Sequence, residues 1–242
     1  MKRQMKVILM AAVALFLMAQ AATASMLIPL NERAAPAPAP EKSPAIADGW
    51  SLERIDFIHY AKPSNPGNSK PAGSCYKLIG YKWKTLPVSY VINPANPQGL
   101  TTDFIASKLS LSAETWDGAT SSELFNDSYT LDSSAAYGTQ DFRNSIAFGD
   151  YADNNVIAVT SIWYTRKAKQ IVEFDMLFNT RFSWGDAVLD PSKMDLQNIA
   201  AHEIGHATGL GDIYSDSCSA VTEYGYSGYG ETQKRILDWE RK

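Results

Sequence analysis

Hydrophobic and polar residues alternate in several short runs of the chain, and this alternation predicts β-strands. The strands expected on this basis are 55–60, one or two within 78–93, 145–148, 156–164 and 170–179. A basic turn is expected at 165–169, between the last two strands.

Two segments show apolar residues at helical spacing instead. The first is 101–117, which begins with threonines that can cap a helix. The second is 196–208, where Asp195 is placed to cap the first turn. Gly209 should end this helix, because glycine tolerates the left-handed backbone of a helix C-terminus.

The first 24 residues have the order of a secretory signal peptide. Three basic residues precede an apolar run at 7–19, and an Ala-x-Ala cleavage signal follows at 22–24. A membrane anchor is the alternative, but the run is shorter than the ~20 residues that span a bilayer. We therefore expect cleavage near Ala24, secretion, and no integral membrane segment in the mature chain.

Eight of the 12 prolines lie between Pro29 and Pro71, including the alternating Ala-Pro tract at 34–40. Such a stretch favours extended conformations and cannot bury a core. We expect residues 25–70 to be a spacer or short pro-region, and residues 71–242 to form one catalytic domain.

Composition narrows the function further. The chain has 45% hydrophobic residues, enough for a packed core, and a net charge of −4 without a basic block. This charge balance argues against nucleic-acid binding. We expect a monomer. Both cysteines, Cys75 and Cys218, lie in the exported part, where an even count favours a disulfide over two free thiols.

The second helix carries the sequence His202-Glu203-Ile204-Gly205-His206. Histidines four positions apart lie on one face of a helix, so both imidazoles can reach a single metal ion. Asp212 follows soon after the expected turn at Gly209 and completes a set of three ligands with an open fourth position. Zn²⁺ is the cofactor this set favours, and Glu203 can accept a proton from a metal-activated water.

Two plainer interpretations remain: two histidines satisfied within an ordinary helix, or a metal site without catalysis. The spacing argues against the first, since two of the three histidines in the chain lie in this one motif.

The motif at 202–212 resembles the zinc signature of metzincin endopeptidases, most closely the matrixin-like members that use Asp as third ligand. The likeness covers roughly residues 75–231. It implies an α+β fold with a twisted mixed sheet packed on two main helices. It also implies that 156–163 is the edge strand, where an extended polypeptide substrate is bound by β-addition.

The sequence departs from this family at several positions. Glu223 stands where the family carries Met, and Tyr224 or Tyr226 could donate to the oxyanion. Cys75 does not match the family's inhibitory propeptide motif, although a role in blocking the metal is an alternative to the disulfide. His59, the remaining histidine, is interpreted as a structural residue.

The acidic loop at 150–155 offers oxygen ligands for Ca²⁺, but a solvated turn is the simpler interpretation. The leading hypothesis is a secreted zinc-dependent endopeptidase. The alternatives are a secreted, non-catalytic binding or scaffold protein on a degenerate protease fold, and a zinc amidase acting on non-protein amides.

Overall fold

The computed structural model describes residues 51–63 and 73–237. The expected signal peptide at 1–24 and the Ala-Pro tract at 34–40 lie outside the described residues. Within the described part, no helix combines the length and apolar character needed to cross a membrane.

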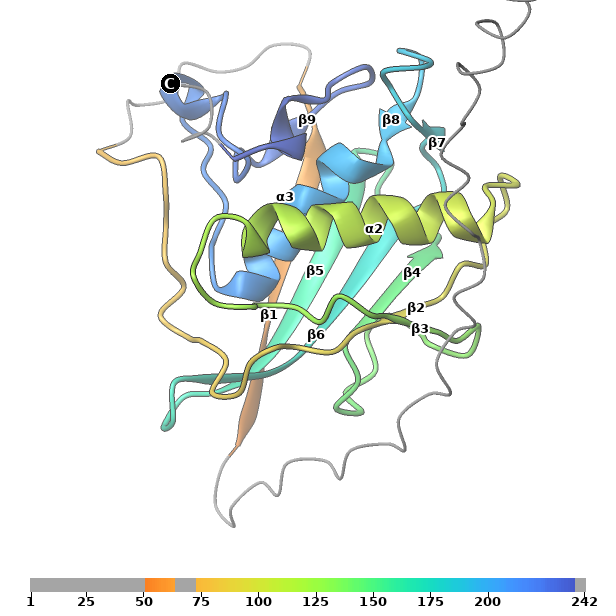
Figure 1. Ribbon diagram of the computed structural model, residues 1–242. Coiled ribbons are helices and arrows are strands. Elements are labelled where there is room, and N and C mark those ends of the chain that lie inside the picture. Colours follow the sequence, from red (N-terminus) through yellow and green to blue (C-terminus); the bar gives the residue numbers. More distant parts are fainter. Residues whose placement is uncertain (1–50, 64–72, 238–242) are drawn as a thin grey trace, which may run out of the picture. The chain divides into compact units, whose positions relative to one another are not determined.

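A mixed seven-stranded sheet is the framework of the described part, and its strand order is β3-β2-β4-β6-β5-β1-β9 (Figure 1). The strands are β1 (Leu52–Ala61), β2 (Val91–Ile92), β3 (Thr130–Leu131), β4 (Ser145–Gly149), β5 (Val156–Thr165), β6 (Gln170–Asn179) and β9 (Tyr226–Ser227). A separate pair is formed by β7 (Trp184–Gly185) and β8 (Met194–Asp195). The general α+β class expected from the sequence is confirmed.

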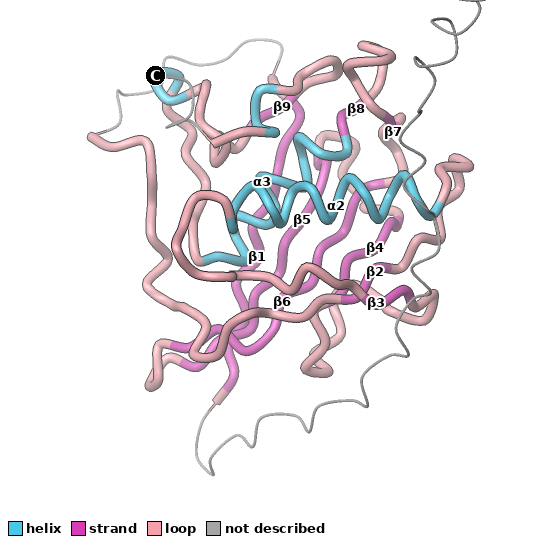
Figure 2. The backbone as a smooth tube through the Cα atoms, in the orientation of Figure 1, coloured by secondary structure: helices cyan, strands magenta, loops and turns pink. Residues whose placement is uncertain are grey.

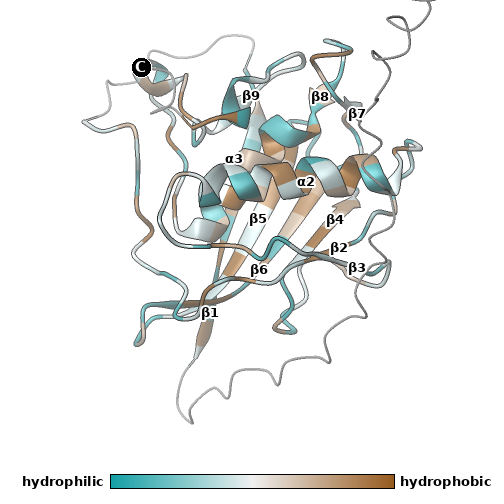
Figure 3. Cartoon of the chain, viewed as in Figure 1, coloured by the Kyte–Doolittle hydropathy of each residue, from teal (hydrophilic) through white to brown (hydrophobic). Residues whose placement is uncertain are grey.

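Two α-helices, α2 (Thr102–Asp117) and α3 (Leu196–Thr208), cover one face of the sheet (Figure 1). Short 3₁₀ helices follow, η1 (Asp216–Cys218) and η2 (Gln233–Arg235). Apolar residues of the strands lie beneath the two helices, and this layer is the main core (Figure 3). The indole of Trp116 joins the helices by donating to the carbonyl of Ala201 at 2.8 Å.

Both predicted helices form with the expected caps. The Thr101 hydroxyl accepts from the amide of Phe104, and the Asp195 carboxylate accepts from the amide of Asn198. Gly209 ends α3 with φ of 107°, a left-handed conformation that glycine adopts without strain. β5 and β6 also form where the sequence predicted strands, and they pair antiparallel across the turn between them.

Of the one or two strands expected within 78–93, the structure forms the short β2, while 78–90 is largely loop (Figure 2). It contacts the sheet through an isolated bridge from Lys82 to Gln170, and Val88 forms another isolated bridge with the loop residue Phe125. Pro87 lacks an amide proton, and Gly80 has a positive φ, so a regular ladder is interrupted twice. The aromatic residues of this segment pack against the core from a loop.

The strand β5 is not at the sheet edge, so the edge position expected for 156–163 is wrong. β1 pairs antiparallel with β5 from Leu52 opposite Thr165 to Tyr60 opposite Val156. β1 falls within the expected spacer, yet it belongs to the same compact unit as the rest of the sheet. The expected boundary at residue 71 therefore does not separate β1 from the domain.

Cys75 and Cys218 form a disulfide across 143 residues, as predicted. The bond excludes the alternative in which Cys75 blocks a metal as a free thiolate, because its sulfur is already bonded. It ties the start of the 73–237 segment to the loop that follows α3.

We predict that replacing both cysteines by serine lowers the free energy of unfolding by up to about 5 kcal/mol, the chain-entropy value for a loop of this length. Denaturant unfolding with and without a reductant measures this. The double variant should be insensitive to reductant. An unchanged midpoint for the reduced wild-type chain would contradict the prediction.

Candidate metal centre

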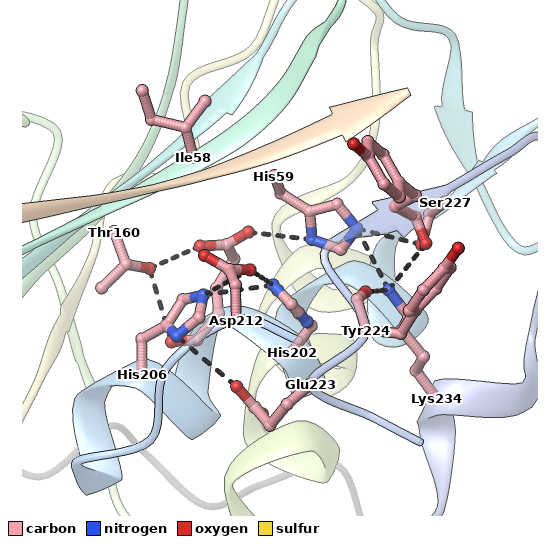
Figure 4. Close-up of polar contacts among 12 residues, drawn as sticks. Ile58, His59, Thr160, His202, His206, Asp212, Glu223, Tyr224, Ser227 and Lys234 are labelled. Atoms are coloured by element: carbon pink, nitrogen blue, oxygen red, sulfur yellow. Dashed lines mark hydrogen bonds and ion pairs between the residues drawn. The ribbon is translucent and has the colours of Figure 1, made fainter. Parts of the chain in front are cut away.

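The helix α3 presents His202 and His206 on one face, one turn apart. Gly209 then reverses the chain direction, and the carboxylate of Asp212 returns to the same side (Figure 4). The Nε2 atoms of the two histidines are 3.1 Å apart. Oδ1 of Asp212 lies 3.3 Å from Nε2 of His202 and 3.6 Å from Nε2 of His206. The structure therefore brings together the three residues that the sequence identified as ligands.

The opposite ring nitrogens fix the tautomer of both histidines. Nδ1 of His202 donates to the carbonyl of Thr222 at 2.8 Å, and Nδ1 of His206 donates to the carbonyl of Leu210 at 3.0 Å. The protons are thereby placed on Nδ1, and the lone pairs of both Nε2 atoms face each other. Metal-binding histidines are commonly oriented in this way by carbonyl acceptors.

These three facing atoms are all acceptors, and no proton is shared among them. Burial lowers the pKa of His202 to about 3, with the positive charge of Lys234 acting in the same direction. Burial also lowers the pKa of His206, so both rings are neutral. Acceptors at such short separations repel one another unless a cation lies between them.

The spacing also fits one ion. Tetrahedral bonds of about 2.0–2.1 Å place ligand atoms about 3.3–3.4 Å apart, a separation that lies within the observed range of 3.1 to 3.6 Å. The buried group of His202, His206 and Asp212 could hold a metal ion. This donor set of two imidazoles and one carboxylate is one that Zn²⁺ accepts.

Glu203 lies beside this group and is almost completely buried. Oε2 accepts a hydrogen bond of 2.6 Å from the hydroxyl of Thr160 on β5. Burial raises the pKa of Glu203 to about 8, against the opposing effect of the Thr160 hydrogen bond. The carboxyl is thus a group that can exchange a proton near neutral pH. Thr160 was not identified from the sequence.

His59 from β1 also reaches this group, which the structural interpretation of this residue did not anticipate (Figure 4). Its ring is fully buried and lies edge-on to His202, with ring centroids 3.9 Å apart. Nδ1 of His59 is 3.3 Å from Oε1 of Glu203. The alternation of Phe57 and His59 on one face of the predicted strand was the available signal for this burial.

Lys234 from η2 contacts the other ring nitrogen of His59, Nε2. Its buried ammonium contacts Nε2 of His59 at 3.1 Å and also donates to the carbonyls of Tyr224 and Tyr226. Ser227 is a second neighbour, with its hydroxyl 3.0 Å from Nε2. Burial lowers the pKa of Lys234 to about 7. No motif in the sequence marked this lysine.

Glu223 is buried beneath α3. Its Oε2 lies 3.4 Å from Nδ1 of His206, whose proton is donated to Leu210. Neither carboxyl oxygen has a hydrogen-bond partner among the described residues. Burial, followed by the charge of Asp212, raises the pKa of Glu223 well above its usual value.

The remaining candidates have other partners. The hydroxyl of Tyr224 donates to Asp216 at 2.9 Å, and the ring of Tyr226 packs against Tyr214 and Tyr224. In the loop considered for Ca²⁺, the oxygens of Asp150, Ala152 and Asn154 accept hydrogen bonds from Arg181. The guanidinium therefore supplies the positive charge at this loop.

No protein-family model matches the sequence, and no curated protein matches it at a significant level.

We predict that Glu223→Met stabilises the protein. Methionine has a similar length and removes two buried oxygens that lack partners, each of which costs about 1–3 kcal/mol. Thermal or denaturant unfolding measures the gain. Glu223→Gln is the matched control, because it keeps polar atoms in the same place and should gain less. A lower midpoint for Glu223→Met than for wild type would contradict this.

We predict the opposite effect for Gly205→Ala. A Cβ there would lie 1.9 Å from Oε1 of Glu223 and 2.6 Å from the Trp116 ring. Alanine is the better helix former by about 1 kcal/mol, but overpacking of this kind costs about 1–3 kcal/mol. The net loss should shrink in the Gly205→Ala/Glu223→Ala double variant. Additive losses in unfolding experiments would show that the contact with Glu223 is unimportant.

Proposed function

We propose that this chain is a secreted zinc-dependent endopeptidase of the metzincin class, similar to its matrixin-like members. The observation that carries the proposal is the convergence of three buried acceptor atoms, from His202, His206 and Asp212, beside an independently held Glu203. A signal-like leader and the disulfide agree with export.

The residues of the site divide the chemistry between them. His202, His206 and Asp212 would hold Zn²⁺, which when bound activates water and polarises the carbonyl of a peptide bond. Glu203 accepts the proton of the attacking water and delivers it to the leaving amine. Thr160 fixes one carboxyl oxygen of Glu203, so the other oxygen is left to face the reacting groups.

An extended polypeptide is the substrate that the sheet favours. β5 pairs with β6 along one edge, and along its other edge it pairs with β1, an extended segment that lies beside the site. An extended polypeptide could pair with this edge in the same way if it replaced β1. Main-chain pairing along a strand positions an internal peptide bond, which supports endopeptidase over exopeptidase activity.

A second function has its own supporting observation. Glu223 is buried and unpartnered where metzincins carry Met, which is consistent with a binding or scaffold protein that keeps the metal for structure alone. Turnover separates the two hypotheses, because both require the metal.

We predict that the purified chain contains one equivalent of zinc and that His202→Ala loses most of it. Glu203→Ala should retain the zinc, because Glu203 is not one of the three converging ligands. Elemental analysis after gel filtration measures both. Equal zinc in wild type and His202→Ala would overturn the ligand assignment.

We also predict that Glu203→Ala lowers casein hydrolysis by about 100-fold or more, the usual size of a general-base contribution. Because β1 lies across Glu203, the assay is run on the intact chain and on a chain cut between β1 and Cys75 at an engineered protease site. Glu123→Ala, which alters an exposed carboxylate after α2, is the matched control. Zinc-loaded protein that cleaves no unfolded polypeptide in either form would favour the scaffold hypothesis.

A further inference from the structure

The strand β1 lies in a slot between two other strands. Along its length it pairs antiparallel with β5, and at its end Tyr60 and Ala61 pair parallel with β9. Main-chain hydrogen bonds close the slot, from the amide of Tyr60 to the carbonyl of Gly225 and from Lys62 to Ser227. β1 thus uses the β5 edge where a polypeptide substrate would otherwise pair.

Two side chains of β1 turn inward from this slot onto α3. The Phe57 ring stacks on His206, with centroids 4.3 Å apart and planes within 17°. The ring of His59 meets His202 and the carboxyl of Glu203. Both contacts are made with residues of the candidate metal centre, although β1 is far from α3 in the sequence.

His59 lies against the carboxyl oxygen of Glu203 that Thr160 does not bond. Thr160 bonds Oε2, and Nδ1 of His59 lies 3.3 Å from Oε1. In its ammonium form Lys234 only donates, so Nε2 of His59 accepts and Nδ1 carries the proton that faces Glu203. Oε1 forms no hydrogen bond among the described residues, but the buried ring of His59 lies directly against it and excludes water from that side.

The strand is weakly embedded compared with its neighbour. Only Phe57 and His59 of β1 are buried, whereas every residue of β5 is buried. Ile55 and Ala61 are partly buried against the core, and Glu53 pairs with the exposed Arg166. β1 also precedes Cys75, so the disulfide does not tie it to the domain.

We propose that β1 is a built-in occupant of the substrate position, and that His59 keeps the site silent by engaging Glu203 until β1 is displaced. This inference rests on the proposed peptidase function. It assigns the inhibition to His59 on β1. Cys75 takes no part, because it is bonded to Cys218.

The test uses the full zinc-loaded chain with a recognition sequence for a site-specific protease placed within residues 64–72. After cutting, a fluorescent peptide corresponding to residues 51–62 should exchange into the cut chain and not into the intact chain. Fluorescence anisotropy measures the binding. Casein hydrolysis by the cut chain should exceed that of the intact chain about tenfold or more on dilution, and added peptide should reverse the gain.

Two altered peptides test whether His59 is the residue through which β1 binds the site. Loss of the buried contacts of His59 should weaken binding of the His59→Ala peptide about tenfold or more, as expected for a hydrogen bond to a charged group. The Ile58→Ala peptide is the matched control, because its altered side chain lies on the opposite face of the strand and is only half-buried. Its affinity should stay within a few-fold of the native peptide.

The outcomes separate this inference from the peptidase proposal. A cut chain that binds the peptide through His59 but cleaves nothing would retain the occupant role of β1 and refute the peptidase. An intact chain as active as the cut chain would overturn the inference. A cut chain that never exchanges β1 for the peptide would also overturn it. The same holds if circular dichroism shows that the domain unfolds when β1 leaves, because β1 would then be part of the fold.

Discussion

Three acceptor atoms without a shared proton are the constraint on which the site depends. The Nε2 atoms of His202 and His206 and Oδ1 of Asp212 are buried within 3.6 Å of one another. Their protons are held on the far side of the rings by two main-chain carbonyls, so rotation or proton exchange cannot relieve the repulsion. The turn at Gly209 and the loop that supplies Thr222 therefore serve one purpose, which is to keep this cluster ready for a cation.

The local parts of this arrangement could be predicted from the sequence. The length of α3 follows from Asp195 and Gly209, and the pairing of His202 with His206 follows from the helical repeat. These features depend on neighbours in the sequence. The position of β1 depends on a partner about a hundred residues away, and no pattern within 52–61 states which strand it will join. The resemblance to metzincins placed β5 at the edge, and the sequence of β1 gave no reason to correct that expectation or to place His59 beside the metal centre.

The loop at 78–90 shows a second limit. Its aromatic and β-branched residues are typical of strands, and they are indeed drawn towards the core. Burial alone does not make a ladder, however, because Pro87 and the backbone at Gly80 interrupt the hydrogen bonds. Lys234 was missed for a different reason. A lysine is almost always exposed, and only the tertiary structure surrounds this one with main-chain carbonyls and an imidazole.

The order of β1, residues 64–72 and Cys75 along the chain has a kinetic consequence. While β1 is covalently joined to the domain, its return to the slot is an intramolecular event, which favours pairing over that of a separate strand. A single break in the tether removes this advantage, and the strand then competes at its bulk concentration. The rest of the chain keeps its covalent anchor at Cys218. A molecule with this layout would convert in one direction only, since dilution carries away the piece needed for return.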